Sequence, residues 1–358
     1  MKILTVVGAR PQFIKAAAMS RVLREAHQEV LVHTGQHFDP QMSEVFFREL
    51  CIPRPDYNLG ISGGTHAQMT ARMLTALEEV LTTEAPDALL VYGDTNSTLA
   101  AALAAVKLHV PILHVEAGNR LGSMQNPEEV NRILTDHMAT RLYACVPSAM
   151  EMLNREGLGD RAMWAGDPML DAFFYYRAKQ GDSLPPELPG ADGVTIVTPS
   201  NFYYLTCHRE ENTRDEAMLA EILRAMESLD APTLYPLHPR NRAMALALRD
   251  KLCLRNVRML DSLGYLKSIQ LCAHARKVVT DSGGVQREAY FAGVPCVTVF
   301  DFAVWPETMA GGWNRLSRPD RAELLNRLAQ KPDSAERVDS FGDGHACEKI
   351  VRDLQNGI

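Results

Sequence analysis

Short apolar runs rich in β-branched residues alternate with longer segments of helical periodicity along the 358-residue chain. This alternation is typical of βα units built around a parallel sheet, and it leaves few other folds open. The sequence therefore predicts an α/β protein. We expect strands at residues 3–7, 29–33, 88–92, 110–114, 141–146 and 162–165 in the first half, and at residues 202–207, 233–237, 257–260, 277–280 and 294–300 in the second half.

A stretch rich in Pro, Gly, Asp and Ser at residues 178–193 interrupts this pattern and is the strongest linker candidate in the chain. We therefore expect an N-terminal Rossmann-like domain over residues 1–180 and a C-terminal one over residues 194–340. Residues 341–358 are expected to form a helix, which is a candidate for packing back on the N-terminal domain. The strand ends should face a cleft between the domains, because α/β sheets bind ligands at the carboxyl ends of their strands.

Charge and composition exclude several classes of protein. The chain has 37 Lys and Arg against 44 Asp and Glu, and its net charge of −7 is not that of a nucleic-acid-binding protein. No apolar run reaches the roughly 20 residues that span a bilayer, and the apolar start of the chain is too short for a signal peptide. Seven cysteines without C-x-x-C spacing favour neither a disulfide framework nor structural zinc. We expect a cytoplasmic protein that binds neither nucleic acid nor membrane.

The loop at residues 8–15 follows the first predicted strand and has features of a phosphate site. Gly8 permits a tight turn, and Arg10 and Lys15 carry charges that can neutralise a phosphate. The alternative interpretation is an ordinary βα loop with surface charges.

A second loop of this kind opens a predicted helix in the second half. Gly283 and Gly284 would let backbone N–H groups approach an anion, and the Walker and G-x-G-x-x-G patterns are absent. Glu288, one turn further on, is placed to bond ribose hydroxyls. The alternative interpretation is a plain helix cap by Asp281 or Ser282.

Carboxylates gather in the first half of the chain. Asp94 and Glu116 each follow a predicted strand, so they are either bonded by neighbouring N–H groups or tuned as acid–base groups. Glu128 and Arg132 are four residues apart on a predicted helix, where pairing with each other is the ordinary explanation.

Histidines follow three strands, at His33 with His37, at His208 and at His238. A metal site is disfavoured, and His208 beside an arginine fits phosphate or sugar contacts better. Cys207 is either a thiol nucleophile or, since it lies in a strand pattern, a buried and inert side chain.

Taken together, these segments resemble the non-hydrolysing UDP-N-acetylglucosamine 2-epimerase family, in order and over essentially the whole chain. The matching segments are GARPQFIK at 8–15, HTGQHFD at 33–39, VYGDTNST at 91–98, HVEAG at 114–118, PEEVNR at 127–132, GDPM at 166–169, HREEN at 208–212 and DSGGVQ at 281–286. The resemblance implies a glycosyltransferase-B-like pair of domains with UDP in the cleft. Residues 63–70, GGTHAQMT, also resemble the branch that acts on UDP-2,3-diacetamido-2,3-dideoxyglucuronate for surface polysaccharides.

The resemblance implies inversion at C2 of UDP-GlcNAc to give UDP-ManNAc, by elimination of UDP to a 2-acetamidoglucal and re-addition. It requires no metal and no cofactor, and it implies a homodimer that can bind a second UDP-GlcNAc as activator. By their matching positions, the acid–base carboxylates correspond to Asp94, Glu116 and Glu128, and the substrate and phosphate contacts at the catalytic centre to Arg132 and His208. The nucleotide contacts correspond to Arg10 and Lys15, the diphosphate cradle to Ser282, Gly283 and Gly284, and the ribose contact to Glu288. The activator site corresponds to Gln36, Arg72 and His238.

Three departures from the family pattern leave the sugar open. In residues 300–307, Phe300, Ala303 and Val304 replace an Arg, a Thr and a Glu of the family, which removes two charges from a phosphate-binding segment. Residues 116–121 read EAGNRL, and residues 121–126 lack the usual charged or aromatic side chains. UDP-GlcNAc is the default substrate and the diacetamido uronate the alternative. The same motifs leave three further functions open: a hydrolysing epimerase, a UDP-sugar-binding protein with impaired catalysis, and a glycosyltransferase.

Overall fold

The computed structural model describes residues 1–36 and 46–357. The chain divides into two compact units, which we describe separately. Unit 1 comprises Met1–Tyr175 and Asp339–Ile358, and unit 2 comprises Tyr176–Val338. Within the described ranges, no helix is long and apolar enough to cross a membrane.

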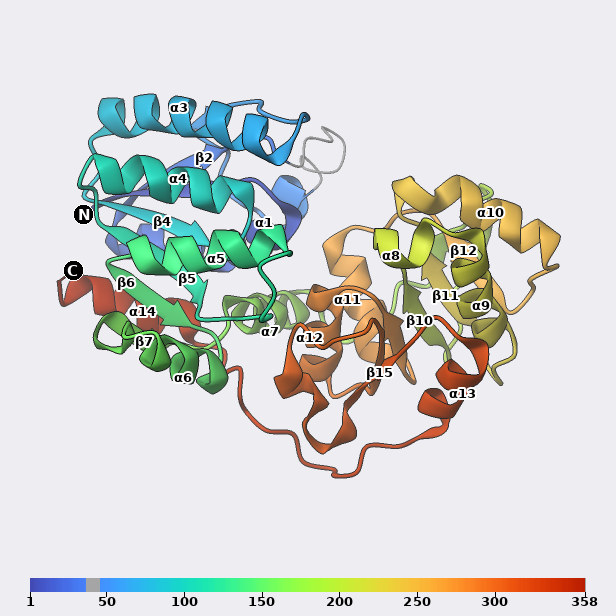
Figure 1. Cartoon of the computed structure of the whole chain (residues 1–358). Helices are drawn as coiled ribbons and strands as arrows, with labels where there is room; N and C mark the ends of the chain where they lie inside the picture. Colours follow the sequence, from blue (N-terminus) through green and yellow to red (C-terminus); the bar gives the residue numbers. More distant parts are fainter. Residues whose placement is uncertain (37–45, 358) are drawn as a thin grey trace. The chain divides into compact units, whose positions relative to one another are not determined.

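Unit 1 is built on a seven-stranded parallel sheet with the order β3-β2-β1-β4-β5-β6-β7. The strands are β1 Lys2–Val7, β2 Gln28–His33, β3 Tyr57–Asn58, β4 Ala88–Tyr92, β5 Ile112–Ala117, β6 Arg141–Ala144 and β7 Ala162–Trp164. The helices are α1 Arg10–Ala26, α3 His66–Glu84, α4 Asn96–Lys107, α5 Pro127–Met138, α6 Pro147–Arg155 and α14 Ala346–Gln355, with a 3₁₀ turn η1 at Gly159–Arg161. Helix α7, Pro168–Gln180, begins in unit 1 and ends in unit 2. Helices α3, α4 and α5 lie side by side, and α1 packs against α14 (Figure 1).

Unit 2 repeats this plan with a six-stranded parallel sheet in the order β12-β11-β10-β13-β14-β15. Its strands are β10 Tyr203–Thr206, β11 Thr233–Pro236, β12 Val257–Leu260, β13 Val278–Thr280, β14 Cys296–Val299 and β15 Asn314–Ser317. Its helices are α8 Glu210–Thr213, α9 Glu216–Glu227, α10 Arg242–Lys251, α11 Tyr265–His274, α12 Gly283–Ala292 and α13 Arg321–Ala329, with 3₁₀ turns η2 at Pro239–Asn241 and η3 at Pro306–Gly312. The α/β class with two Rossmann-like halves is therefore confirmed.

Each sheet has one point at which the strand order reverses. In unit 1 the chain runs from β1 outward to β3 and returns to place β4 on the other side of β1. In unit 2 it runs from β10 outward to β12 and returns to place β13 beside β10. Connections leave in opposite directions at such a point, so a crevice opens at the carboxyl ends of the two strands, where ligands bind in this fold class. The loops after β1, β4, β10 and β13 are therefore the places to look for a site.

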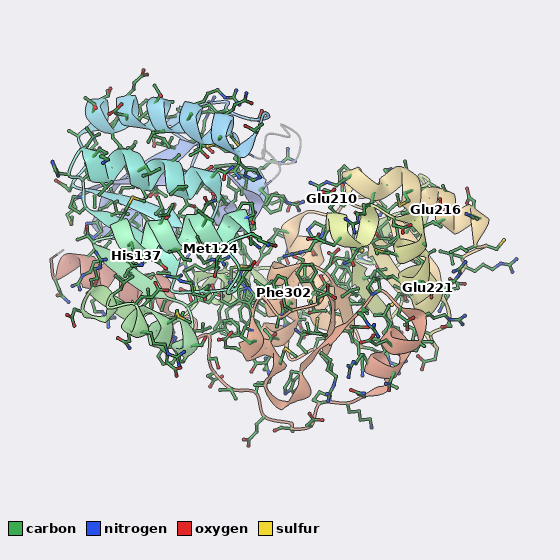
Figure 2. All side chains as sticks on the ribbon, in the orientation of Figure 1. Met124, His137, Glu210, Glu216, Glu221 and Phe302 are labelled. Atoms are coloured by element: carbon green, nitrogen blue, oxygen red, sulfur yellow. The ribbon has the colours of Figure 1, made fainter. Side chains whose placement is uncertain are left out.

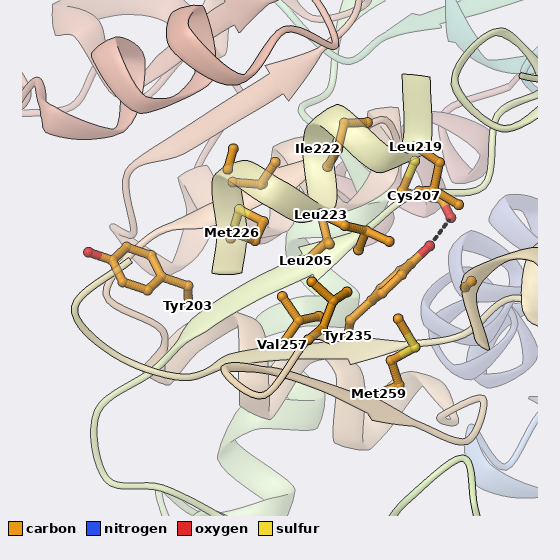
Figure 3. Packing of buried hydrophobic residues seen from close by; sticks show 14 of the residues in the cluster. Tyr203, Leu205, Cys207, Leu219, Ile222, Leu223, Met226, Tyr235, Val257 and Met259 are labelled. Carbon is orange, nitrogen blue, oxygen red and sulfur yellow. Dashed lines mark hydrogen bonds between the residues drawn. The ribbon is translucent and has the colours of Figure 1, made fainter. Parts of the chain in front are cut away.

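The core of unit 2 explains why its central strands read as continuous apolar runs. Leu205 from β10 and Leu223 from α9 pack with Val257 from β12, and all three are nearly or completely buried (Figure 3). The Tyr235 hydroxyl donates a hydrogen bond to the Cys207 carbonyl oxygen at 3.1 Å, so even the polar atom of this buried ring is satisfied. The Cys207 side chain belongs to the same cluster, and burial raises the pKa of its thiol well above the usual value. This favours the buried, inert interpretation of Cys207.

The segment interpreted as a linker has secondary structure of its own. Helix α7 continues to Gln180, and β8 Glu187–Pro189 pairs antiparallel with β9 Thr195–Val197. Leu188 is 1% exposed because it packs into a core cluster of unit 2. Residues 176–193 therefore belong to unit 2, which begins earlier than the expected boundary.

The C-terminal segment belongs to unit 1. The Asp171 carboxylate in α7 accepts hydrogen bonds from the backbone N–H groups of Ala346 and Cys347 at 3.1 and 2.8 Å, at the start of α14. The Tyr143 hydroxyl donates to Asp353 further along the same helix at 3.0 Å. These bonds attach α14 to the sheet of unit 1.

Candidate active site

The loop after β1 is fixed to the loop after β4 by the amide of Gln12. Its oxygen accepts hydrogen bonds from the backbone N–H groups of Gly8 and Ala9 at 2.8 and 3.1 Å. Its nitrogen donates to the Tyr92 carbonyl oxygen at 2.7 Å and to the Thr98 hydroxyl at 2.9 Å. Gln12 therefore holds these two segments together at the carboxyl ends of β1 and β4. Gln12 was not among the predicted site residues, although it lies within the matching segment at residues 8–15.

Gly8 is required at this turn for steric reasons. A Cβ atom at position 8 would lie 2.1 Å from the Ser97 Oγ and 2.3 Å from the Thr34 Oγ1, closer than any real contact. The same Ser97 donates its backbone N–H and its hydroxyl to the Gln36 amide oxygen, at 3.0 and 2.7 Å. Gln36 is thus attached to the N-terminus of α4. His37, Phe38 and Asp39 of the same motif lie outside the described residues.

Glu116 and Lys15 form an ion pair at the carboxyl end of the sheet. The Lys15 Nζ lies 2.5 Å from the Glu116 Oε2, and the two side chains are 2% and 10% exposed. Glu116 lies within β5 at a register shift and has a φ of +72°, a strained conformation for a residue other than glycine. Gly93 makes room for the pair, because a Cβ there would lie 3.2 Å from the Glu116 Oε1. Lys15, which was predicted to neutralise a phosphate, is thus paired with the Glu116 carboxylate.

Asp94 follows β4 and forms an ion pair with the Arg132 guanidinium. Arg132 also donates to the Glu129 Oε2 at 2.5 Å. Burial alone would lower the pKa of Arg132, but the two carboxylates raise it, so its charge is secure. The Asp94 backbone carbonyl accepts from the Asn131 amide at 2.9 Å. The proposed pairing of Arg132 with Glu128 was wrong, because Asp94 and Glu129 take both ends of the guanidinium.

Glu128 is exposed in the first turn of α5, just after the N-cap Asn126, whose Oδ1 accepts its backbone N–H at 2.9 Å. Met124, in the loop before this helix, is 63% exposed (Figure 2). The structure thus places Asp94 and Glu116 at neighbouring strand ends and leaves Glu128 at the surface of the helix beside them.

Two further predicted contacts of unit 1 have identified neighbours. The Arg10 guanidinium lies 4.8 Å from the centre of the Phe46 ring. The Arg72 guanidinium donates to the carbonyl oxygens of Ser62 and Gly63 at 3.0 and 2.5 Å.

In unit 2, His208 and Asp281 meet at the reversal point between β10 and β13. The His208 Nδ1 lies 2.7 Å from the Asp281 Oδ1, and the backbone N–H groups of His208 and Arg209 each donate to Oδ2 at 2.8 Å. Burial alone would raise the pKa of Asp281, but the hydrogen bond and charge of His208, with these backbone donors, hold it below its usual value. An ionised Asp281 accepts a hydrogen bond from a protonated Nδ1 of His208. The Nε2 atom of this half-exposed ring is then the nitrogen that can contact a ligand.

Ser282, and not Asp281, caps helix α12. Its hydroxyl oxygen accepts the Val285 backbone N–H at 3.4 Å. A Cβ at Gly283 would meet Val304 at 3.5 Å, so the segment that departs from the family pattern lies against this helix N-terminus. Glu288 is 4% exposed. Burial raises the pKa of Tyr265, and the negative charge of Glu288 raises it further.

Aromatic side chains surround the loop after β10. The Arg209 guanidinium lies 4.4 Å from the centre of the Phe300 ring, and Phe300 packs edge-on against Phe302 at 4.5 Å. Phe302 is 38% exposed on this surface (Figure 2). The His238 ring lies 5.4 Å from the His208 ring, and its Nδ1 accepts the Arg240 N–H at 3.2 Å. Phe300 therefore gives Arg209 a π face at a position where the family resemblance predicts a second cation.

Glu116, Cys145 and Asp167 bring three donor atoms within 4.8 Å of one another. These atoms are of the types that ligate metals, but the Lys15 ammonium is paired with Glu116 and would repel a cation.

Comparison with known proteins gives a consistent result. The sequence model of the UDP-N-acetylglucosamine 2-epimerase family matches residues 21–355. The chain is 44% identical to a UDP-2,3-diacetamido-2,3-dideoxy-D-glucuronate 2-epimerase of Pseudomonas aeruginosa, over 99% of both chains. It is 35% identical to a UDP-N-acetylglucosamine 2-epimerase of Methanocaldococcus jannaschii, over 100% of both. The crystal structure of a Methanocaldococcus jannaschii UDP-GlcNAc 2-epimerase in complex with UDP-GlcNAc and UDP superimposes with a TM-score of 0.85 at 34% identity, over 100% of both chains.

Proposed function

The chain belongs to the UDP-N-acetylglucosamine 2-epimerase family, and on this basis we propose that it inverts the configuration at C2 of a UDP-2-acetamido sugar without net hydrolysis. The observation that carries this proposal is the placement of Asp94 and Glu116 at neighbouring strand ends in unit 1. Both carboxylates form ion pairs with cations, Arg132 and Lys15 respectively. At the carboxyl ends of neighbouring parallel strands, they are placed to exchange protons with a bound ligand.

The proposed reaction begins with transfer of the C2 proton to a carboxylate. The electron pair of the C2–H bond forms a C1=C2 double bond, and the C1–O bond to UDP breaks, so that UDP leaves as the anion. UDP then adds back to C1 of the 2-acetamidoglucal, and C2 receives a proton on the opposite face from a second carboxyl group, which must begin the cycle in its acid form. Two proton-transfer groups are needed, one for each face, and Asp94, Glu116 and Glu128 are the candidates.

The diphosphate leaving group needs positive charge and N–H donors as it departs. In unit 2 we assign this role to His208, whose orientation is set by Asp281, together with the N-terminus of α12 at Gly283 and Gly284. Arg209, stacked on Phe300, is the neighbouring cation.

Two sugars are candidates, and each is favoured by a specific observation. The 44% identity to the Pseudomonas aeruginosa enzyme and the segment at residues 63–70 favour UDP-2,3-diacetamido-2,3-dideoxyglucuronate. The family match and the 32–35% identities to several UDP-GlcNAc 2-epimerases favour UDP-GlcNAc. We place the uronate first, because the higher identity extends over 99% of both chains.

The test is to incubate the purified protein with each UDP-sugar and to identify products by ion-exchange chromatography and proton NMR. We expect an equilibrium mixture of the two C2 epimers, still attached to UDP, with the uronate turned over faster. Free sugar with UDP would indicate a hydrolysing epimerase. Binding of UDP without conversion of either sugar would indicate a UDP-sugar-binding protein.

The homodimer and the activator effect stay predictions of the family resemblance. Light scattering of the protein as it elutes from a size-exclusion column measures its mass and so tests the homodimer. Initial rates over a UDP-GlcNAc titration measure the second, with Gln36, Arg72 and His238 as the residues to vary.

A further inference from the structure

His114 lies in β5 with its ring completely buried and hydrogen-bonded at both nitrogens. Nδ1 lies 2.7 Å from the Asp136 Oδ1, and Nε2 lies 2.7 Å from the Gly93 carbonyl oxygen. A carbonyl oxygen can only accept, so Nε2 must carry a proton. The Asp136 Oδ2 accepts the backbone N–H of Gly118 at 3.0 Å and lies 2.7 Å from the Arg120 Nη1, so Asp136 is in its carboxylate form and its Oδ1 accepts as well. Both ring nitrogens therefore carry protons, and His114 and Asp136 form a buried ion pair.

The ion pair contacts the main chain on both sides of the proposed catalytic centre. Through His114 it holds the carbonyl oxygen of Gly93, the residue directly before Asp94. Through the Asp136 Oδ2 it accepts the backbone N–H of Gly118, two residues after Glu116, at 3.0 Å.

The two turns that it holds contain residues with positive φ. Glu116 and Gly118 have φ values of +72° and +83°, and the pairing of β5 with β6 shifts between Val115 and Ala117. Gly93 has a φ of +62°, and its N–H donates to the Val115 carbonyl oxygen at 2.9 Å. Glycine adopts such φ values readily, so the strain lies at Glu116. A strained residue persists when its surroundings over-determine it, and the buried pair contacts the main chain beside it.

We propose that His114 and Asp136 are positioning residues that fix Asp94 relative to Glu116, so that the two carboxylates meet opposite faces of C2. This inference rests on the proposed epimerase function. Arg120 completes the arrangement, because its Nη1 lies 2.7 Å from the Asp136 Oδ2 and its Nε donates to Glu156 at 2.8 Å. A small displacement of either carboxylate is expected to slow proton transfer more than it weakens nucleotide binding.

The test compares Asp136→Asn and His114→Gln with Glu29→Gln. Glu29 is a matched control because it is also a buried carboxylate of unit 1 with an arginine partner, Arg24, yet it lies at the amino end of β2, away from the strand ends that carry Asp94 and Glu116. For each variant one measures kcat, KM, UDP affinity by calorimetry and the urea unfolding midpoint. Asp136→Asn also stands in should His114→Gln fail to fold.

We expect all three variants to unfold at lower urea, and only the His114 and Asp136 variants to lose kcat, by about 10–100-fold with KM and UDP affinity changed less than about threefold. The double variant His114→Gln/Asp136→Asn, which again matches donors with acceptors, should recover part of kcat. A kcat for Asp136→Asn within threefold of the wild type, or an equal loss of kcat in Glu29→Gln, would overturn the positioning role and leave the proposed function intact. A wild type that converts neither UDP-sugar would overturn the proposed function and this inference with it.

A second readout concerns the charge on the ring. In protein labelled with ¹⁵N-histidine, the His114 signals are those lost in His114→Gln. We expect both ring nitrogens to have the shifts of protonated imidazolium nitrogens at neutral pH, and an unprotonated nitrogen would contradict the ion pair.

Discussion

Lys15 and Glu116 form an ion pair that is almost entirely withdrawn from solvent, with Nζ and Oε2 separated by 2.5 Å. One residue comes from α1 and the other from β5, so the pair ties the first βα unit to the strand that carries a proposed acid–base group. It therefore contributes to the fold and to the proposed chemistry at once.

Lys15→Met should destabilise the protein strongly. It leaves Glu116 nearly buried without its ammonium partner, which typically costs about 3–5 kcal/mol. Lys251 pairs with Glu216 at 2.6 Å, but the side chains are 68% and 52% exposed, so Lys251→Met should cost less than about 1 kcal/mol. Urea unfolding of the two variants measures the difference, and equal costs would refute the importance of burial here.

Asp94→Asn should lower turnover by about 10²–10⁴-fold and leave UDP affinity nearly intact, if Asp94 transfers a proton. Arg132 keeps its bond to Glu129 in this variant, so the local fold should survive. Steady-state kinetics and calorimetry with UDP measure the two quantities. A parallel loss of affinity and turnover would make Asp94 a structural residue.

Asp281→Asn should reduce kcat/KM by about tenfold or more, because His208 loses the anion that orients its Nδ1 proton. Asp261, which pairs with Arg242 at the surface, supplies the control Asp261→Asn, for which we expect no change. Unaltered kinetics in Asp281→Asn would show that His208 needs no such orientation.

The lowered pKa of Asp281 also predicts how stability depends on pH. Its carboxylate stabilises the fold above its usual pKa of 3.8, and this contribution is lost as the pH falls through the lower folded value. Asp136 acts with the same sign. Urea midpoints of the wild type and of Asp281→Asn, measured from about pH 6 to about pH 3, should therefore converge as the pH falls. A gap that widens in acid would contradict this sign.

The strands were predictable because parallel strands buried on both faces leave a continuous apolar signal. The expected strand at 88–92 coincides with β4, Ala88–Tyr92, which is buried throughout. The strand expected at 110–114 in fact runs from Ile112 to Ala117. The strand can include Glu116 because this residue has a positive φ and the pairing shifts in register there, and no residue pattern predicts either feature.

The partners of the site residues were less predictable, because they depend on contacts between distant segments. Helical spacing suggested that Arg132 bonds Glu128, whereas the loop after β4 delivers Asp94 to it. Asp281 was interpreted as a possible helix cap, whereas the reversal of strand order places it beside His208, 73 residues earlier in the chain. Local sequence encodes the elements, and the topology selects the pairs.

The central claim is that C2 inversion proceeds through cleavage of the C2–H bond, and solvent deuterium tests it most directly. The protein is incubated in D₂O with the UDP-sugar that it converts, and the C2 position of the product is examined by proton NMR. We predict deuterium at C2 of the inverted product, one atom per turnover. Inversion with the original hydrogen retained at C2 would contradict the proposed roles of Asp94 and Glu116.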